Sequence, residues 1–222
     1  MSGGSPGSQI EVTGMVLRSA PAGEYDRRVV LLTRELGRVS AFAKGARRPG
    51  STLMAAAAPF AFGRFTIAEG RSSNRLYGAK IESFFESFRE NVQGACYGSY
   101  FLEVSEYVTR EGQDGSPQLL LLYQALRALE NPKLSDRLTR CIFELRTVIL
   151  QGEYPGLPEG RELSPAALRA LQHIETSPSK GLFGIAVNEE ALRQLEAWSG
   201  EVCARSLDHS FASLEILSLL AQ

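Results

Sequence analysis

The chain has 222 residues, of which 44% are hydrophobic and 22% charged, and its formal net charge is −1. This length allows one large or two small domains, and the composition is that of an ordinary globular protein. It has no apolar run of about 18 residues, so we expect no membrane span. The start, MSGGSPGSQ, lacks the build of a signal peptide, and residues 1–9 are predicted to be a disordered lead-in.

Charge is divided unevenly along the chain. Residues 1–80 hold twelve Lys and Arg against five Asp and Glu, a balance of +7, so residues 81–222 carry −8. A basic half followed by an acidic half predicts two domains with different partners. Clustered cations are typical of a module that binds polyanions, and an ordinary solvated surface is the alternative.

The basic half has the pattern of a small β-barrel. Five apolar-rich runs are expected to form strands: residues 10–17, 29–33, 38–43, 60–67 and 76–84. Gly37 closes a tight turn that joins the second and third strands into a hairpin. A helical turn at 53–58 separates the third strand from the fourth. This order predicts an OB-fold over residues 10–84, with a small SH3-like barrel as the alternative.

From about residue 89 the apolar residues follow helical spacing. Helices are expected over residues 92–108, 116–130, 135–151, 164–174, 188–202 and 211–220. Ser116, Ser135, Ser164 and Asn188 are predicted to cap four of them. The predicted fold class is therefore α+β, an N-terminal OB-fold barrel followed by an all-α domain over residues 85–222.

The cysteines do not suggest a metal site. Cys96, Cys141 and Cys203 lie far apart, none belongs to a CxxC pair, and each sits at an apolar helical position. We therefore expect three small buried side chains in a reducing cytoplasm, with no bound metal and no cofactor.

A basic loop follows the third predicted strand, in the string Ala43-Lys44-Gly45-Ala46-Arg47-Arg48-Pro49-Gly50. Guanidinium groups fit phosphate oxygens, and glycines keep such a loop open. With other cations of the barrel, the loop predicts a DNA-binding rim. Its members are Arg27, Arg28, Arg34, Arg38, Lys44, Arg47, Arg48, Arg64 and Arg75. Phe42 and Phe65 are candidates for stacking on bases, and the barrel core is the alternative place for such rings.

Catalysis has little support in the sequence. His173 and His209 both fall in predicted helices of the acidic half, and no nucleotide-binding, hydrolase or metalloprotease motif is present. We predict that the protein is not an enzyme.

Several short strings occur in one order: Gly14-Met15-Val16-Leu17, Leu32-Thr33-Arg34-Glu35-Leu36-Gly37, Ala43-Lys44-Gly45-Ala46-Arg47-Arg48-Pro49 and Ile81-Glu82-Ser83-Phe84. Together they resemble the RecO family of bacterial recombination mediators. Weaker similarity continues through Leu163-Ser164-Pro165 to residues 213–217. Many members carry a four-cysteine zinc module before the Leu163 stretch. The loop from Gln151 to Glu162 has no cysteine, so the chain resembles a zinc-free variant.

The resemblance implies an OB-fold with a helical domain and a role in DNA repair by homologous recombination. Family members bind single- and double-stranded DNA, anneal complementary strands and pair with RecR. They help to load RecA on strands coated by single-stranded DNA-binding protein (SSB), and many engage the acidic tail of SSB, which ends in Phe. The resemblance thus implies a cytoplasmic protein associated with the nucleoid.

Two other functions stay open at this stage. One is an interaction scaffold whose basic barrel docks an acidic protein. The other is an enzyme that modifies RNA or DNA and uses the barrel to bind its substrate. The acidic helical domain is predicted to be the protein-binding half. The cations on its second and third helices are Arg127, Arg137, Arg140 and Arg146.

Overall fold

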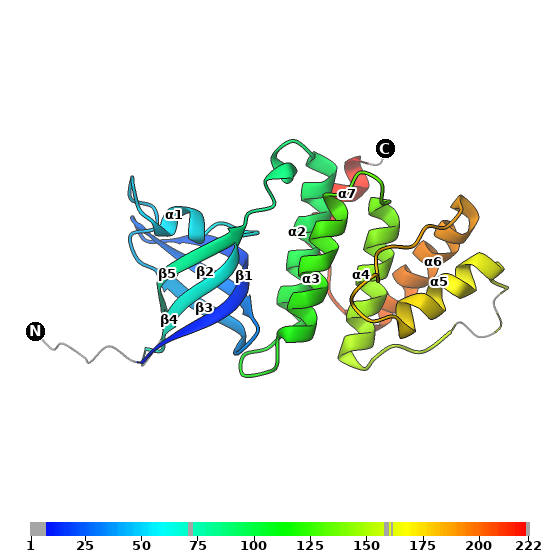
Figure 1. The fold of residues 1–222 in the computed structure, drawn as a ribbon, viewed down its shortest axis with the longest axis horizontal. Coiled ribbons are helices and arrows are strands. Elements are labelled where there is room, and N and C mark those ends of the chain that lie inside the picture. Colours follow the sequence, from blue (N-terminus) through cyan, green and yellow to red (C-terminus); the bar gives the residue numbers. More distant parts are fainter. Residues whose placement is uncertain (1–7, 71–72, 158–159, 161, 221–222) are drawn as a thin grey trace, which may run out of the picture. The chain divides into compact units, whose positions relative to one another are not determined.

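The computed structural model describes residues 8–220 apart from 71–72, 158–159 and 161 (Figure 1). The predicted lead-in 1–9 lies almost wholly outside the described residues, and the first strand already includes Gln9. The strands are β1 (Gln9–Ala22), β2 (Asp26–Thr33), β3 (Gly37–Ala43), β4 (Phe62–Ala68) and β5 (Asn74–Ser83), with α1 (Leu53–Ala56) between β3 and β4. The 3₁₀ helix η1 (Glu86–Arg89) and helices α2 (Val92–Val108), α3 (Ser116–Leu129), α4 (Asp136–Gln151), α5 (Pro165–Thr176), α6 (Glu189–Ser206) and α7 (Ala212–Leu220) follow.

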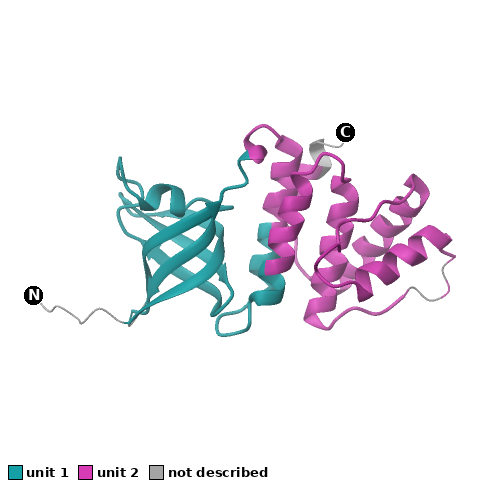
Figure 2. Ribbon diagram, viewed as in Figure 1, with its two compact units in different colours: residues 1–86, 102–119 teal, residues 87–101, 120–222 magenta. Residues whose placement is uncertain are grey.

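The described chain divides into two compact units (Figure 2). The barrel unit contains the residues up to Glu86 together with Leu102–Leu119, and the helical unit contains Ser87–Phe101 and the residues from Leu120 onward. The break near Glu86 lies close to the predicted boundary at residue 84. No local sequence pattern predicted that the end of α2 and the start of α3 belong to the barrel unit.

The strands close a barrel in the order β1-β2-β3-β5-β4, with β1 paired to β4. Only the β3–β5 pairing among these is parallel, and the helical insert lies between β3 and β4. This topology confirms the predicted OB-fold followed by helices. The hairpin at Gly37 is also confirmed, because β2 and β3 pair down to Thr33 opposite Gly37.

Alternation along the strands separates core from surface. In β2, Val29 and Leu31 point into the barrel, and in β3 Val39 and Ala41 do so. The intervening residues of β3 therefore face outward. They are Arg38, Ser40 and Phe42, and all three are half-buried.

The segment Leu102–Leu119 covers part of that outer face. Arg18 of β1 forms a bidentate ion pair with Glu106 of α2, at 2.7 Å for its shortest contact. Arg38 of β3 donates to the carbonyl oxygen of Glu106 at 2.6 Å. A Cβ on Gly115 would lie 2.1 Å from the carbonyl oxygen of Thr33, so the α2–α3 loop approaches β2 as closely as only glycine allows. The end of the β2–β3 hairpin is thereby fixed to this loop.

Gly37 is the central residue of this contact. Its φ is +67°, and a Cβ there would lie 2.3 Å from the carbonyl oxygen of Arg110 and 2.6 Å from that of Gln113. Backbone hydrogen bonds join the same two segments, from Gly112 N to Leu36 O at 2.9 Å and from Arg38 N to Arg110 O at 3.0 Å. The position therefore needs glycine both for its conformation and for the close approach.

The helical unit has a buried polar centre. Glu144 of α4 is 2% exposed, and it accepts hydrogen bonds from Tyr100 of α2 at 2.8 Å, from Arg140 at 2.7 Å and from Ser199 of α6. Burial raises the pKa of Tyr100, so its hydroxyl stays protonated and can donate. One carboxylate thus joins three helices, and removing it would leave the partly buried Arg140 without its carboxylate partner.

The predicted helix starts at Ser135, Ser164 and Asn188 are confirmed, because each side chain accepts a hydrogen bond from a backbone N–H of the first turn. Ser116 differs. It is the first residue of α3, and Asp114 accepts from its backbone N–H at 2.9 Å.

Of the cysteines, Cys141 is buried, whereas Cys96 and Cys203 are half-buried. No helix in the described part of the chain has the length and hydrophobicity to cross a bilayer.

Gly37→Ala should destabilise the protein more than an ordinary glycine replacement. Gly23→Ala is the matched control, since Gly23 also has a positive φ (+72°) but open space where its Cβ would be. We expect a loss of about 1–2 kcal/mol in the free energy of unfolding for the control, from backbone conformation alone, and a larger loss for Gly37→Ala. Urea unfolding followed by circular dichroism measures both. Equal losses would mean that the contact with the α2–α3 loop is not tight.

Candidate nucleic-acid interface

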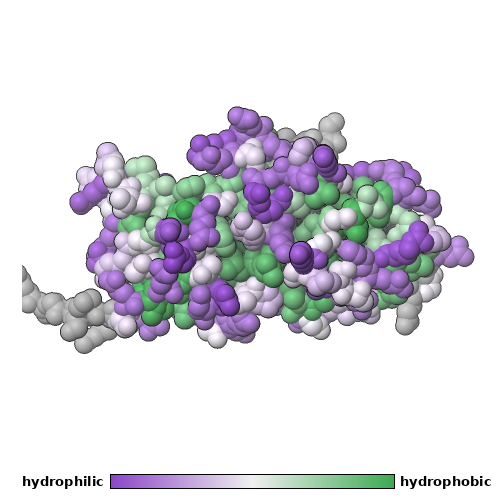
Figure 3. Space-filling view, viewed as in Figure 1, coloured by the Kyte–Doolittle hydropathy of each residue, from purple (hydrophilic) through white to green (hydrophobic). Residues whose placement is uncertain are grey.

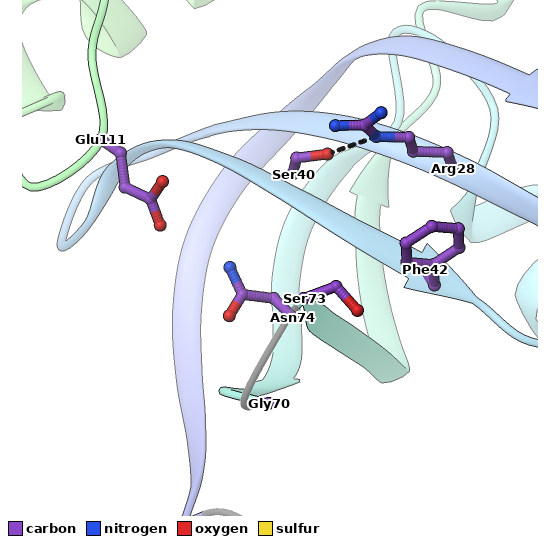
Figure 4. Close-up of a pocket in the computed structure, with 7 residues that line it drawn as sticks. All are labelled: Arg28, Ser40, Phe42, Gly70, Ser73, Asn74 and Glu111. Atoms are coloured by element: carbon purple, nitrogen blue, oxygen red, sulfur yellow. Dashed lines mark hydrogen bonds between the residues drawn. The ribbon is translucent and has the colours of Figure 1, made fainter.

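A groove of about 460 Å³ lies on the outer face of the barrel, where β2 and β3 meet the loop between β4 and β5 (Figure 4). Its lining residues are Arg28, Ser40, Phe42, Gly70, Ser73, Asn74 and Glu111. In OB-folds the β2–β3 face and the adjoining loops are the usual place for oligonucleotides. The groove therefore lies where the fold predicts a nucleic-acid ligand.

One aromatic ring and two cations form a row across the groove side of the barrel. Phe42 of β3 is directly opposite Arg28 of β2 and, on the other side, opposite Arg75 of β5. Arg28 donates from Nε to Ser40 Oγ at 2.9 Å, which holds its guanidinium along the strands (Figure 4). Arg75 lies over the ring of Tyr77, 4.7 Å from its centroid. An aromatic ring between two cations suits a base with its flanking phosphates.

The basic loop is anchored at its base and exposed along its side chains. Gly45 N donates to Asp26 at 2.8 Å, and Arg47 N donates to the carbonyl oxygen of Tyr25 at 2.8 Å. The Arg47 guanidinium donates to the carbonyl oxygen of Gly23 at 3.0 Å, and that of Arg48 lies 4.9 Å from the centroid of the Tyr25 ring. The loop is thus fixed to the β1–β2 turn.

Six of the nine predicted DNA-contacting residues lie on or directly after strands β2, β3 and β5: Arg27, Arg28, Lys44, Arg47, Arg48 and Arg75. All are exposed except Arg27, which is half-buried, alternates with the outward Arg28 and donates to Ser19 Oγ at 3.1 Å. On the face that Figure 3 shows, hydrophilic side chains lie among hydrophobic ones over the barrel unit. Such a surface suits a charged, flexible ligand.

The other three predicted residues lie elsewhere or are engaged. Arg38 is half-buried, and its guanidinium donates to the carbonyl oxygen of Glu106. It is therefore not part of the candidate interface. Arg64 lies on the β1–β4 seam and pairs with Glu11 at 3.1 Å. Arg34 is exposed at the hairpin end, close to Asp114, whose pKa is lowered by the Ser116 hydrogen bonds and by the Arg34 charge.

The two candidate stacking rings have different positions. Phe65 is fully buried in the barrel core, so it cannot stack on a base, and the core alternative is correct for it. Phe42 points outward into the groove (Figure 4). Alternation along β3 from the inward Val39 and Ala41 would have placed Phe42 on the outer face. Ser40, Asn74 and Glu111 were missed, and no local pattern marks Glu111, because it reaches the groove from a distant segment.

Comparison with known proteins points to one family of DNA repair proteins. Residues 8–85 match the family model described as "Recombination protein O N terminal". "DNA repair protein RecO" of Alkaliphilus metalliredigens is 34% identical over 148 residues, which cover 67% of this chain and 58% of that protein. The protein of the same name from Acetivibrio thermocellus is 22% identical over 95% of this chain and 97% of its own length.

Residues 8–85 belong to the RecO N-terminal family, and the chain as a whole is similar to RecO proteins. The protein of the same name from Exiguobacterium sp. is 32% identical over 66% of this chain and 59% of its own length. The matched region therefore spans less than two thirds of the Exiguobacterium and Alkaliphilus proteins. The family model ends at residue 85, close to the end of β5, so it covers the barrel that carries the groove.

The described residues contain no group of three or more His, Cys, Asp or Glu placed to hold a metal ion. Part of the loop from Gln151 to Glu162, where the zinc module of relatives was expected to be missing, lies outside the described residues. His173, one of two histidines considered for catalysis, contacts Ser177 Oγ at 2.9 Å and the carbonyl oxygen of Leu182 at 3.1 Å. It joins the end of α5 to the following loop.

Proposed function

We propose that this chain binds single- and double-stranded DNA and anneals complementary strands during DNA repair by homologous recombination, without catalysing a reaction. The observation that carries the proposal is that the RecO N-terminal match falls on a barrel whose groove lies beside an anchored basic loop. The names of the relatives support the repair role.

The mechanism follows from charge. Lys44, Arg47 and Arg48 are exposed on one loop, where they neutralise phosphates and release counterions. Contacts of this kind carry no sequence information, so binding is largely independent of sequence. Two complementary strands repel each other, and a basic surface that holds both lowers this repulsion. Annealing by this route needs no nucleotide and no cofactor.

The proposal extends to the partners that the family implies: RecR, the acidic tail of SSB and, through them, RecA. In the helical unit the four arginines of the second and third predicted helices have internal partners. Arg127 pairs with Glu130, Arg137 with Glu189 and Glu196, and Arg140 with Glu144. Arg146 donates to three carbonyl oxygens at the end of α5. An acidic tail would therefore use other exposed cations of this unit, such as Arg169 or Arg193. Such a protein acts in the cytoplasm at the nucleoid.

The variant Lys44→Ala/Arg47→Ala/Arg48→Ala tests the DNA site. Three lost phosphate contacts should reduce the slope of log K against log salt by about two to three units. Anisotropy of a labelled oligonucleotide over a range of salt concentrations measures the slope. The matched control removes three exposed cations of the helical unit, in Arg169→Ala/Lys180→Ala/Arg193→Ala. An equal change in both variants, or none in either, would move the DNA site away from the loop.

Annealing is tested with two complementary labelled oligonucleotides, with and without SSB. We expect the protein to accelerate annealing of bare and coated strands at low salt, with the acceleration fading as salt rises. The loop variant should anneal more slowly than the control variant. Tight binding without any acceleration would limit the protein to a recruiting role.

A further inference from the structure

The groove residues of β3 and the basic loop follow one another along the chain. Ser40 and Phe42 occupy successive outward positions of β3, and Lys44 comes next, just after the strand ends. The bases of a DNA strand whose phosphates contact the loop would therefore pass along the groove. This step rests on the proposed DNA binding, and it concerns what the groove holds.

Stacking on the Phe42 ring requires a base with one face free. The ring is half-buried, lines the groove and has a cation on each side, Arg28 and Arg75. Bases within a duplex have both faces covered by their neighbours, whereas an unpaired base can stack on an aromatic ring. The groove volume of about 460 Å³ is within the range of about 300–1,000 Å³ typical of small-ligand pockets, so it admits a base.

Glu111 adds a chemical preference. Its exposed carboxylate lines the groove (Figure 4). A β-bridge between Glu111 and Gly37 holds its backbone there. An ionised carboxylate only accepts hydrogen bonds, and it repels phosphate. Unpaired cytosine, adenine and guanine each carry an exocyclic amine with two N–H donors that suit it. Unpaired thymine has no such amine, and its single ring N–H lies between two oxygen acceptors. The Asn74 amide can donate or accept, so it suits any base.

We propose that this groove binds unpaired bases of a single strand, with one base stacked on Phe42 at one end and another donating its exocyclic amine to Glu111 at the other end (Figure 4). The groove thereby favours single strands over duplex, and cytosine or adenine over thymine. The basic loop supplies affinity that is independent of sequence, and the groove supplies the preference.

Stacking is tested with Phe42→Trp. The chain has one tryptophan, Trp198, which is buried in the helical unit, so the wild-type protein provides the background signal. We expect fluorescence of Phe42→Trp to be quenched by single-stranded oligonucleotides and not by a blunt duplex. Phe42→Leu keeps an apolar side chain and should weaken single-strand binding by about tenfold, with duplex affinity unchanged. Unchanged fluorescence and affinity in a variant that still binds DNA would overturn the proposal.

Base preference is tested with Glu111→Gln. For the wild type we expect oligo-dC and oligo-dA to bind about three- to tenfold more tightly than oligo-dT at one salt concentration, and Glu111→Gln should narrow that ratio. Asp114→Asn is the matched control, because it removes the same charge from the same loop and keeps an oxygen that accepts from Ser116 N. Equal ratios in the wild type, or equal changes in both variants, would overturn the role of Glu111.

The outcomes separate this inference from the proposed function. A normal salt slope that depends on the basic loop, combined with no effect of Phe42→Leu or Glu111→Gln, would remove the groove proposal and leave DNA binding intact. Failure of the wild-type protein to bind any DNA would overturn both.

Discussion

The contact between the β2–β3 hairpin and the α2–α3 loop determines how the barrel surface is used. At the hairpin end the backbones approach so closely at Gly37 and Gly115 that no Cβ fits. This contact covers the end of the outer face that carries Arg38, and it leaves open the end that carries Ser40 and Phe42. It also brings Glu111 to the edge of the groove. The contact between the hairpin and the loop thus determines both which part of the outer face stays open and why Glu111 lies at its edge.

The cations of the barrel unit serve two different purposes. Arg18 and Arg38 bind Glu106, so they join the strands to α2. Ion pairs with one exposed partner contribute about 0–1 kcal/mol, so the hydrogen bond to a carbonyl and the close backbone contacts carry more of this attachment. Lys44, Arg47 and Arg48 remain exposed on an anchored loop. Net charge alone did not distinguish these two groups.

Local signals in the sequence were sufficient for the elements and their order. The turn at Gly37, the insert before β4 and the caps at Ser135, Ser164 and Asn188 all depend on neighbours within a few residues, and the structure confirms them. The site was only partly predictable, because its edge is formed by contacts across long sequence separations. Glu111 reaches Gly37 from 74 positions away, and no pattern around either residue announces this contact.

The most direct test of the account is to locate DNA on the protein by ultraviolet crosslinking of a single-stranded oligonucleotide to the full chain, followed by mass spectrometry. The account predicts crosslinked peptides that contain Phe42 and the exposed Tyr25 and Tyr77. The rings of these two tyrosines lie under the guanidinium groups of Arg48 and Arg75. High salt should remove these crosslinks together. Crosslinks found only in peptides of the helical unit would contradict the central claim that DNA binds to the barrel.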